Sequence, residues 1–123
     1  MADRTLRDCR VLVVEDEYML ADEIVQELTD AGAMVLGPVG TLKDAVDTIG
    51  LKPDIDGAIL DANLRGEMVF PAADLLVALG VPFVFATGYD ASVFPDRFKD
   101  VVRCEKPIDI RHLNNAIGRV ITP

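Results

Sequence analysis

The sequence places polar side chains directly after short apolar segments. Three carboxylates, one hydroxyl and one ammonium stand in such positions. If these segments are the strands of one parallel sheet, their carboxyl ends meet at one edge, where open α/β sheets bind their ligands. We therefore take this edge as the candidate site. Its members are Glu15, Asp16, Asp61, Thr87 and Lys106.

Carboxylates that lie close together indicate a site for a cation. They repel one another, and the repulsion raises their pKa values unless a cation lies among them. Mg²⁺ suits such a site, because it binds a few carboxylates together with waters and phosphate oxygens. Beside the ion, Asp61 could stay ionised and attack phosphorus to give an aspartyl phosphate. Thr87 and Lys106 could then share the charge on the phosphoryl oxygens.

Each of these residues also has a structural interpretation. Acidic residues such as Glu15 and Asp16 often open a helix. Asp61 with Asn63 is typical of a turn after a strand. Thr87 could simply end a strand, and Lys106 could form a turn with Pro107. The joint pattern favours the chemical interpretation, because one member follows each of four predicted strands.

The elements that must position these side chains alternate along the chain. Short apolar runs predict strands, and the stretches between them carry apolar residues at helical spacing. This alternation predicts a parallel α/β sheet with right-handed crossovers and helices on both faces. The predicted strands are Arg10–Val14, Ala33–Gly37, Ile55–Leu60, Val81–Ala86 and Val101–Cys104.

Four helices are predicted between and after these strands. The first ends at Gly32, the second is capped by Thr41, the third is Pro71–Leu79, and the last is capped by Asp109. The stretch from 90 to 100 is expected to be irregular, because Pro95 interrupts any helix there. The apolar residues that recur at helical spacing in these helices, and are expected to face the core, are Ala21, Ile24, Val25, Leu28, Ala31, Leu42, Ala45, Val46, Ile49, Leu113, Ala116, Ile117 and Val120.

Composition limits the class of protein. The chain has 123 residues, 50% of them apolar, which predicts a single domain over 1–123 without an output domain. A net charge of −9 disfavours nucleic-acid binding, which depends on cations that neutralise phosphates. No apolar run reaches the roughly 20 residues that span a bilayer, and the charged start is no signal segment, so we expect a cytoplasmic protein. For Cys9 and Cys104 we favour buried free thiols over a disulfide or metal pair.

Four segments together resemble the receiver domains of bacterial response regulators. They are VLVVEDE, ILDANL, FATG and EKPID, and the likeness extends over nearly the whole chain. It implies a flavodoxin-like, doubly wound five-stranded parallel sheet in the order 2-1-3-4-5. The phrase PFVFATGY further resembles a stand-alone subgroup of regulators, the "FAT GUY" group.

The resemblance also implies roles for individual residues. Asp61 would accept a phosphoryl group from a phosphohistidine of a sensor kinase or phosphotransfer protein, and Thr87 and Lys106 would contact that group. His112 is expected on the surface of the last helix and cannot serve as the donor. The protein would be a signalling protein, at most phosphorylating and dephosphorylating itself, and a monomer or a phosphorylation-dependent dimer. The Mg²⁺ ligands would be Asp16 directly, Glu15 through water, Asp61, and the backbone carbonyl of Asn63.

Two departures from the receiver pattern concern signal output. Receivers usually carry a Tyr or Phe three residues before the lysine, and here that position is Arg103. The fourth helix is also expected to be shortened. We hypothesise that the loop beginning at Tyr89 reorders in place of the missing ring, the alternative being that Tyr89 is a partly buried loop residue.

Other functions remain open at this stage. An adaptor with a receiver fold and no phosphorylation would need none of the site residues. A Mg²⁺-dependent phosphatase with an aspartyl nucleophile would need an acid two residues after Asp61, where Asn63 stands. A nucleotide-binding role is disfavoured, because no glycine-rich phosphate loop follows a strand.

Overall fold

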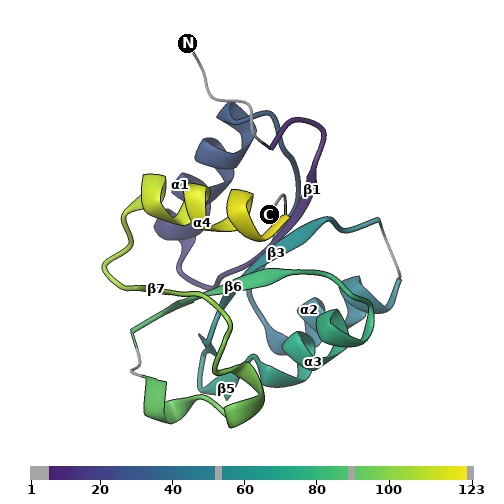
Figure 1. Cartoon of the computed structure of the whole chain (residues 1–123), viewed down its shortest axis with the longest axis vertical. Coiled ribbons are helices and arrows are strands. Elements are labelled where there is room, and N and C mark those ends of the chain that lie inside the picture. Colours follow the sequence, from purple (N-terminus) through teal and green to yellow (C-terminus); the bar gives the residue numbers. More distant parts are fainter. Residues whose placement is uncertain (1–5, 52–53, 89–90, 122–123) are drawn as a thin grey trace.

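The computed structural model describes residues 6–51, 54–88 and 91–121 and has a parallel five-stranded sheet at its centre (Figure 1). The strand order is β2-β1-β3-β6-β7, which confirms the predicted doubly wound topology with the 2-1-3-4-5 order. The third to fifth predicted strands correspond to β3, β6 and β7, since two short strands intervene. The bounds are β1 Arg10–Val14, β2 Met34–Val39, β3 Gly57–Asp61, β6 Phe83–Thr87 and β7 Arg103–Glu105.

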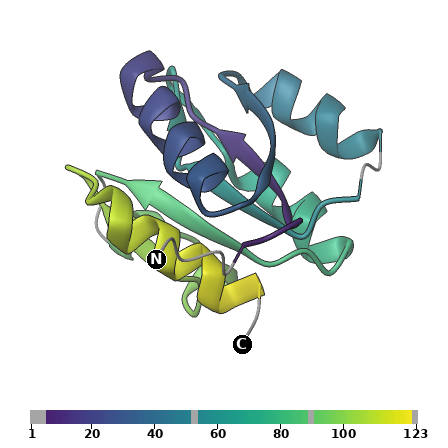
Figure 2. The ribbon, with the colours of Figure 1, turned by 90° about the horizontal axis from the view of Figure 1, so that it is seen from above.

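Helices cover both faces of the sheet (Figures 1 and 2). α1 and α4 pack side by side on one face, and α2 and α3 pack together on the other. None of the helices in the described part of the chain is long and apolar enough to cross a membrane. The bounds are α1 Tyr18–Asp30, α2 Leu42–Gly50, α3 Phe70–Ala78 and α4 Ile110–Ile121.

The interior strand β1 shows how one strand contributes side chains to two apolar layers. Side chains of a strand alternate between the two faces of a sheet. Val11 and Val13 contribute to the layer beneath α1 and α4, whereas Leu12 and Val14 contribute to the layer beneath α2 and α3. All four are fully buried. A continuous apolar run is therefore what a strand covered on both faces requires.

The predicted helix caps are present. The Thr41 hydroxyl accepts a hydrogen bond of 3.0 Å from the backbone N–H of Asp44. Asp109 accepts hydrogen bonds from the backbone N–H groups of Arg111 (3.0 Å) and His112 (3.3 Å). Each cap satisfies backbone donors that have no partner within the helix.

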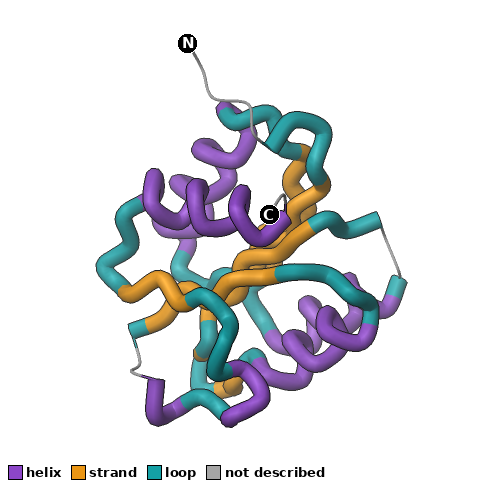
Figure 3. Tube along the Cα trace, in the orientation of Figure 1, coloured by secondary structure: helices purple, strands orange, loops and turns teal. Residues whose placement is uncertain are grey.

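Between β6 and β7, where the shortened helix was expected, the chain forms two short 3₁₀ turns, Ala91–Val93 and Asp96–Phe98 (Figure 3). The predicted shortening of the fourth helix is thus confirmed. Phe94 and Phe98 pack into a cluster of rings that also holds Phe70, Phe83 and Phe85.

Two arginine side chains contact the neighbours of these 3₁₀ turns. The Arg97 guanidinium donates hydrogen bonds of 2.8 and 3.0 Å to the two carboxylate oxygens of Asp74 on α3. The Arg103 guanidinium, at the position where receivers usually carry a ring, lies 5.6 Å from the centroid of Phe94. Tyr89, the residue of our loop hypothesis, lies outside the described residues.

The structure corrects two expectations. A small antiparallel hairpin, β4 Asn63–Leu64 and β5 Glu67–Met68, follows β3 and was not predicted. Cys9 is only partly buried, whereas Cys104 is buried as expected, and both are free thiols. Cys9 precedes β1 and lies at the rim of the apolar layer, which explains its partial exposure.

Candidate functional site

The sheet brings the predicted polar residues to its carboxyl edge. Asp61 is the last residue of β3 and pairs in register with Ala86 of β6. Thr87 follows Ala86, ends β6 and is fully buried. The backbone N–H of Lys106 donates to the Thr87 carbonyl over 2.8 Å, which continues the pairing of β6 with β7 beyond Glu105. Parallel register therefore determines which side chains meet here.

Three carboxylates form the centre of this edge. Glu15, Asp16 and Asp61 each offer an oxygen, and these oxygens lie within 4.8 Å of one another. Glu15 and Asp61 are only 3% and 5% exposed, so their charges are poorly solvated. Burial, followed by a hydrogen bond to Asp61 and the charge of Asp61, raises the pKa of Glu15 to about 8. Two buried carboxyl groups this close cannot both ionise cheaply without a cation.

Lys106 supplies one positive charge to the cluster. Its Nζ donates to Asp61 Oδ2 over 2.9 Å and lies 3.5 Å from Glu15 Oε1 and 3.9 Å from Glu17 Oε2. Burial alone lowers the pKa of Lys106, but the hydrogen bond to Asp61 and the nearby negative charges outweigh it, so the pKa is raised. Lys106 is therefore a fixed ammonium that contacts the Asp61 carboxylate.

The unpredicted hairpin completes the edge. The backbone N–H of Asn63 donates to Asp61 Oδ1 over 3.1 Å, so both Asp61 oxygens have a donor. The backbone N–H of Arg65, at the turn of the hairpin, donates to Asp16 Oδ2 over 3.1 Å. Sequence reasoning missed Arg65, because a backbone donor leaves no signature in side-chain type.

The donor set suits Mg²⁺. The three carboxylates are hard oxygen ligands, which this ion prefers. Glu15 Oε1 is buried and accepts no hydrogen bond within the described part of the chain, although the Lys106 ammonium lies 3.5 Å away. A buried carboxylate oxygen without a donor is chemically suited to bind a cation.

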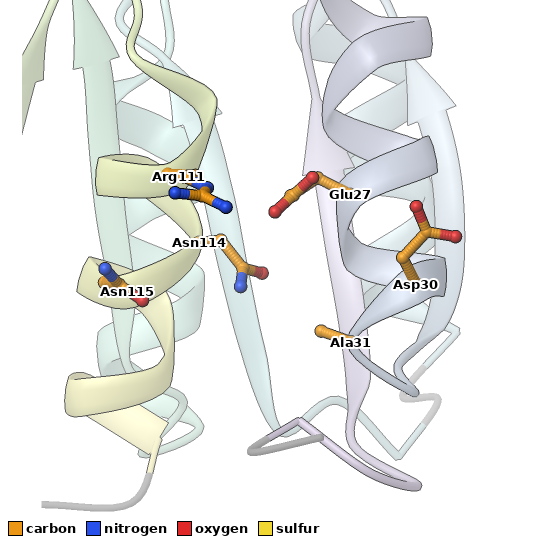
Figure 4. A pocket seen from close by; sticks show the side chains of 6 residues that line it. All are labelled: Glu27, Asp30, Ala31, Arg111, Asn114 and Asn115. Carbon is orange, nitrogen blue, oxygen red and sulfur yellow. The ribbon is translucent and has the colours of Figure 1, made fainter. Parts of the chain in front are cut away.

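His112 and a polar hollow both lie away from this edge. His112 is exposed on α4. A polar hollow of about 280 Å³ lies between α1 and α4, with Arg111 and Asn114 extending from α4 toward α1 (Figure 4). None of the predicted site residues lines this hollow, so it is separate from the carboxylate cluster.

Comparison with known structures gives several matches across the chain. SdrG from Sphingomonas melonis Fr1 is 34% identical, with a TM-score of 0.79, and the match covers 94% of this chain and 98% of that one. A BeF3-activated conformation of SdrG from Pseudomonas melonis Fr1 is 32% identical, with a TM-score of 0.75, and covers 99% and 100%.

A third match shows the fold alone. The response regulator receiver protein from Sinorhizobium medicae WSM419 is 23% identical, with a TM-score of 0.79, and the match covers 94% of this chain and 96% of that one. No family model and no curated protein sequence matches the chain.

Proposed function

This chain belongs to the receiver family of response regulators, and on that premise we propose that it accepts a phosphoryl group on Asp61 and passes the signal on by contact with other proteins. The observation that carries the proposal is the meeting of three carboxylates and the Lys106 ammonium at Asp61. No other cluster of this composition occurs among the described residues.

The transfer step requires a nucleophile and a leaving group. An oxygen of Asp61 attacks the phosphorus of a phosphohistidine, forming an O–P bond as the N–P bond breaks. The electron pair of that bond returns to the imidazole nitrogen, which then takes up a proton. The product is an acyl phosphate on Asp61. For this attack an Asp61 oxygen must give up its present donor, so the Lys106 ammonium turns from the carboxylate to the incoming phosphoryl oxygens.

The surrounding residues would stabilise the negative charge of the transferred phosphoryl group. Lys106, which contacts Asp61, would stabilise one phosphoryl oxygen, and the hydroxyl of Thr87, the residue after Asp61's register partner Ala86, would stabilise a second. Glu15, Asp16, Asp61 and the backbone carbonyl of Asn63 would hold Mg²⁺. When bound, the ion neutralises the carboxylates and the charge on the transferred group.

The partner must bring its histidine to this edge. A hollow of about 610 Å³ flanks Lys106 and is lined partly by Met19, Pro107 and Ile108. Met19 and its neighbour Tyr18 are 72% and 84% exposed. An apolar face of a sensor kinase or phosphotransfer protein covering these side chains would hold its phosphohistidine over Asp61. We further propose that the protein acts as a single receiver domain in the cytoplasm, as a monomer or a phosphorylation-dependent dimer, without binding nucleic acid.

Incubation with a small phosphodonor and Mg²⁺, followed by intact mass measurement, tests the proposal. We expect the mass of one phosphoryl group to be added to the wild type and to Asp54→Ala, but not to Asp61→Ala. Asp54 is a suitable control because it is an exposed aspartate on the same chain. Absence of the adduct from the wild type would leave a phosphorylation-independent adaptor, and steady turnover of a phosphomonoester would indicate a phosphatase.

A further inference from the structure

The hairpin after β3 contains a turn that is built for backbone donation. Strands β4 and β5 pair Asn63 with Met68 and Leu64 with Glu67, which leaves Arg65 and Gly66 as the two turn residues. Their φ angles are 53° and 91°. A two-residue turn of type I′ requires positive φ at both positions, and a residue with a bulky side chain rarely occupies the first.

The side chain of Asn63 holds this turn closed. Its Oδ1 accepts a hydrogen bond of 2.7 Å from the backbone N–H of Gly66. Leu64 anchors the hairpin below, since it is 2% exposed and lies in the apolar layer with α2 and α3. The tip of the hairpin is thus fixed both by a local hydrogen bond and by the core.

The tip of the hairpin contacts Asp16, which follows the end of β1. The Arg65 N–H donates to Asp16 Oδ2, although the two residues are 49 positions apart in the chain. Asp16 is only partly buried and follows the end of β1, so its carboxylate needs an external group to fix its direction. The Asn63 N–H meanwhile donates to Asp61 Oδ1. The hairpin therefore contacts two of the three carboxylates.

We propose that the β4–β5 hairpin is the positioning element of the cation site, with the Asn63 side chain as its lock. Asn63 closes the turn, the closed turn presents the Arg65 N–H, and this donor orients the Asp16 carboxylate toward Asp61. The inference rests on the proposed Mg²⁺ role of these carboxylates. It gives the Asn63 side chain a function that is separate from any role of its backbone carbonyl.

Calorimetric titration with Mg²⁺ and amide hydrogen exchange test this role on the full chain. In Asn63→Ala we expect Mg²⁺ to bind about tenfold more weakly, as is typical when a partner of a metal ligand is lost. The Arg65 and Gly66 amides should exchange faster in the same variant. Asn63→Asp keeps an acceptor oxygen and should restore the protection of both amides. Lys43→Met changes an exposed side chain on α2, outside the site, and its Mg²⁺ affinity should stay within about twofold of the wild type.

The result that overturns the proposal is a folded Asn63→Ala whose Mg²⁺ affinity and Arg65 protection match the wild type. If Asn63→Ala does not fold, Asp16→Ala tests the contact between the Arg65 N–H and Asp16 instead. Its Arg65 amide should then exchange faster than in the wild type while its Gly66 amide is unchanged, and equal Arg65 exchange rates would refute the contact. Failure of the proposed function is distinguishable, because Mg²⁺ binding would still depend on Asn63 while no phosphoryl group is added.

Discussion

The Lys106 ammonium lies 2.9 Å from Asp61 Oδ2 and 3.5 Å from Glu15 Oε1, so one cation contacts two buried carboxyl groups. Lys106→Met removes it and leaves the Asp61 carboxylate without its hydrogen-bonded counter-charge. In metal-free buffer we expect the free energy of unfolding to fall by roughly 1–3 kcal/mol, less than for a fully buried pair because Lys106 is partly exposed. Mg²⁺ should stabilise this variant more than the wild type. Urea unfolding with and without Mg²⁺ measures both effects.

Lys43→Met is the matched control for this prediction. Lys43 forms an ion pair of 2.7 Å with Asp47, but both side chains are exposed. Exposed pairs contribute little, because solvent screens them, and we expect a much smaller change than in Lys106→Met. Equal losses in the two lysine variants would contradict the assigned role of Lys106.

The raised pKa of Glu15 makes folding stability depend on pH. The pKa rises from an ordinary 4.5 to about 8 in the folded protein, which therefore favours the protonated form. The stability that Glu15 contributes is then fully present below pH 4.5 and is lost as the pH rises to about 8. Glu15→Gln should thus become more stable than the wild type across this window, by roughly 4 kcal/mol at its upper end.

Chemical unfolding between pH 4.5 and 9 in metal-free buffer measures this difference. Glu17→Gln serves as the control, because the Glu17 side chain is 63% exposed. Its stability curve should run parallel to that of the wild type. A constant difference between Glu15→Gln and the wild type at every pH would show that Glu15 ionises normally.

The aromatic cluster beneath the 3₁₀ turns should dominate the stability of that segment. Phe98 is 1% exposed, and its ring centroid lies 5.6 Å from those of Phe70 and Phe85. We expect Phe98→Ala to lower the free energy of unfolding by about 3–5 kcal/mol, as for other large core truncations. Its neighbour Arg97 forms an exposed ion pair with Asp74, and Arg97→Ala should lower the free energy of unfolding much less than Phe98→Ala, because solvent screens such pairs. Thermal unfolding of both variants compares them, and a larger loss in Arg97→Ala would contradict this ranking.

Sequence patterns predicted β1, β3 and β6 well because each is a compact, mainly apolar run. β7, Arg103–Glu105, is not such a run, and the predicted Val101–Cys104 overlaps it only at Arg103 and Cys104. Arg10–Val14 was predicted with its observed bounds, since both of its faces are covered. The end of the third predicted strand shifted by one residue, from Leu60 to Asp61, because backbone pairing with β6 continues through Asp61. Side-chain type alone does not report that pairing.

The hairpin escaped prediction for a different reason. Asn-Gly and Asp-Gly are the usual signals of a two-residue hairpin turn, and here the turn is Arg65-Gly66. Its strands are two residues long, too short for a visible alternation of apolar and polar residues. What holds the turn is Asn63 and the distant Asp16, and contacts between remote segments cannot be derived from local pattern.

Two glycines with nearly equal φ angles separate backbone strain from steric clash. Gly37 (φ 93°) and Gly66 (φ 91°) both adopt a conformation that side chains disfavour. A Cβ on Gly66 would meet nothing within 4 Å, whereas a Cβ on Gly37 would lie 2.8 Å from the Val13 carbonyl oxygen and 2.9 Å from the Val39 nitrogen. Gly66→Ala should therefore cost about 1–2 kcal/mol from conformation alone.

Gly37→Ala should cost distinctly more than Gly66→Ala, because its methyl group meets backbone atoms of β1 and β2 that cannot rotate away. We expect an additional loss of about 2 kcal/mol or more, in the range typical of overpacked sites. Urea unfolding of both variants at one pH gives the comparison. Similar losses would mean that β2 can move away from β1 at Val13 to admit the methyl group, and hence that this edge of the sheet is less tightly held than its contacts indicate.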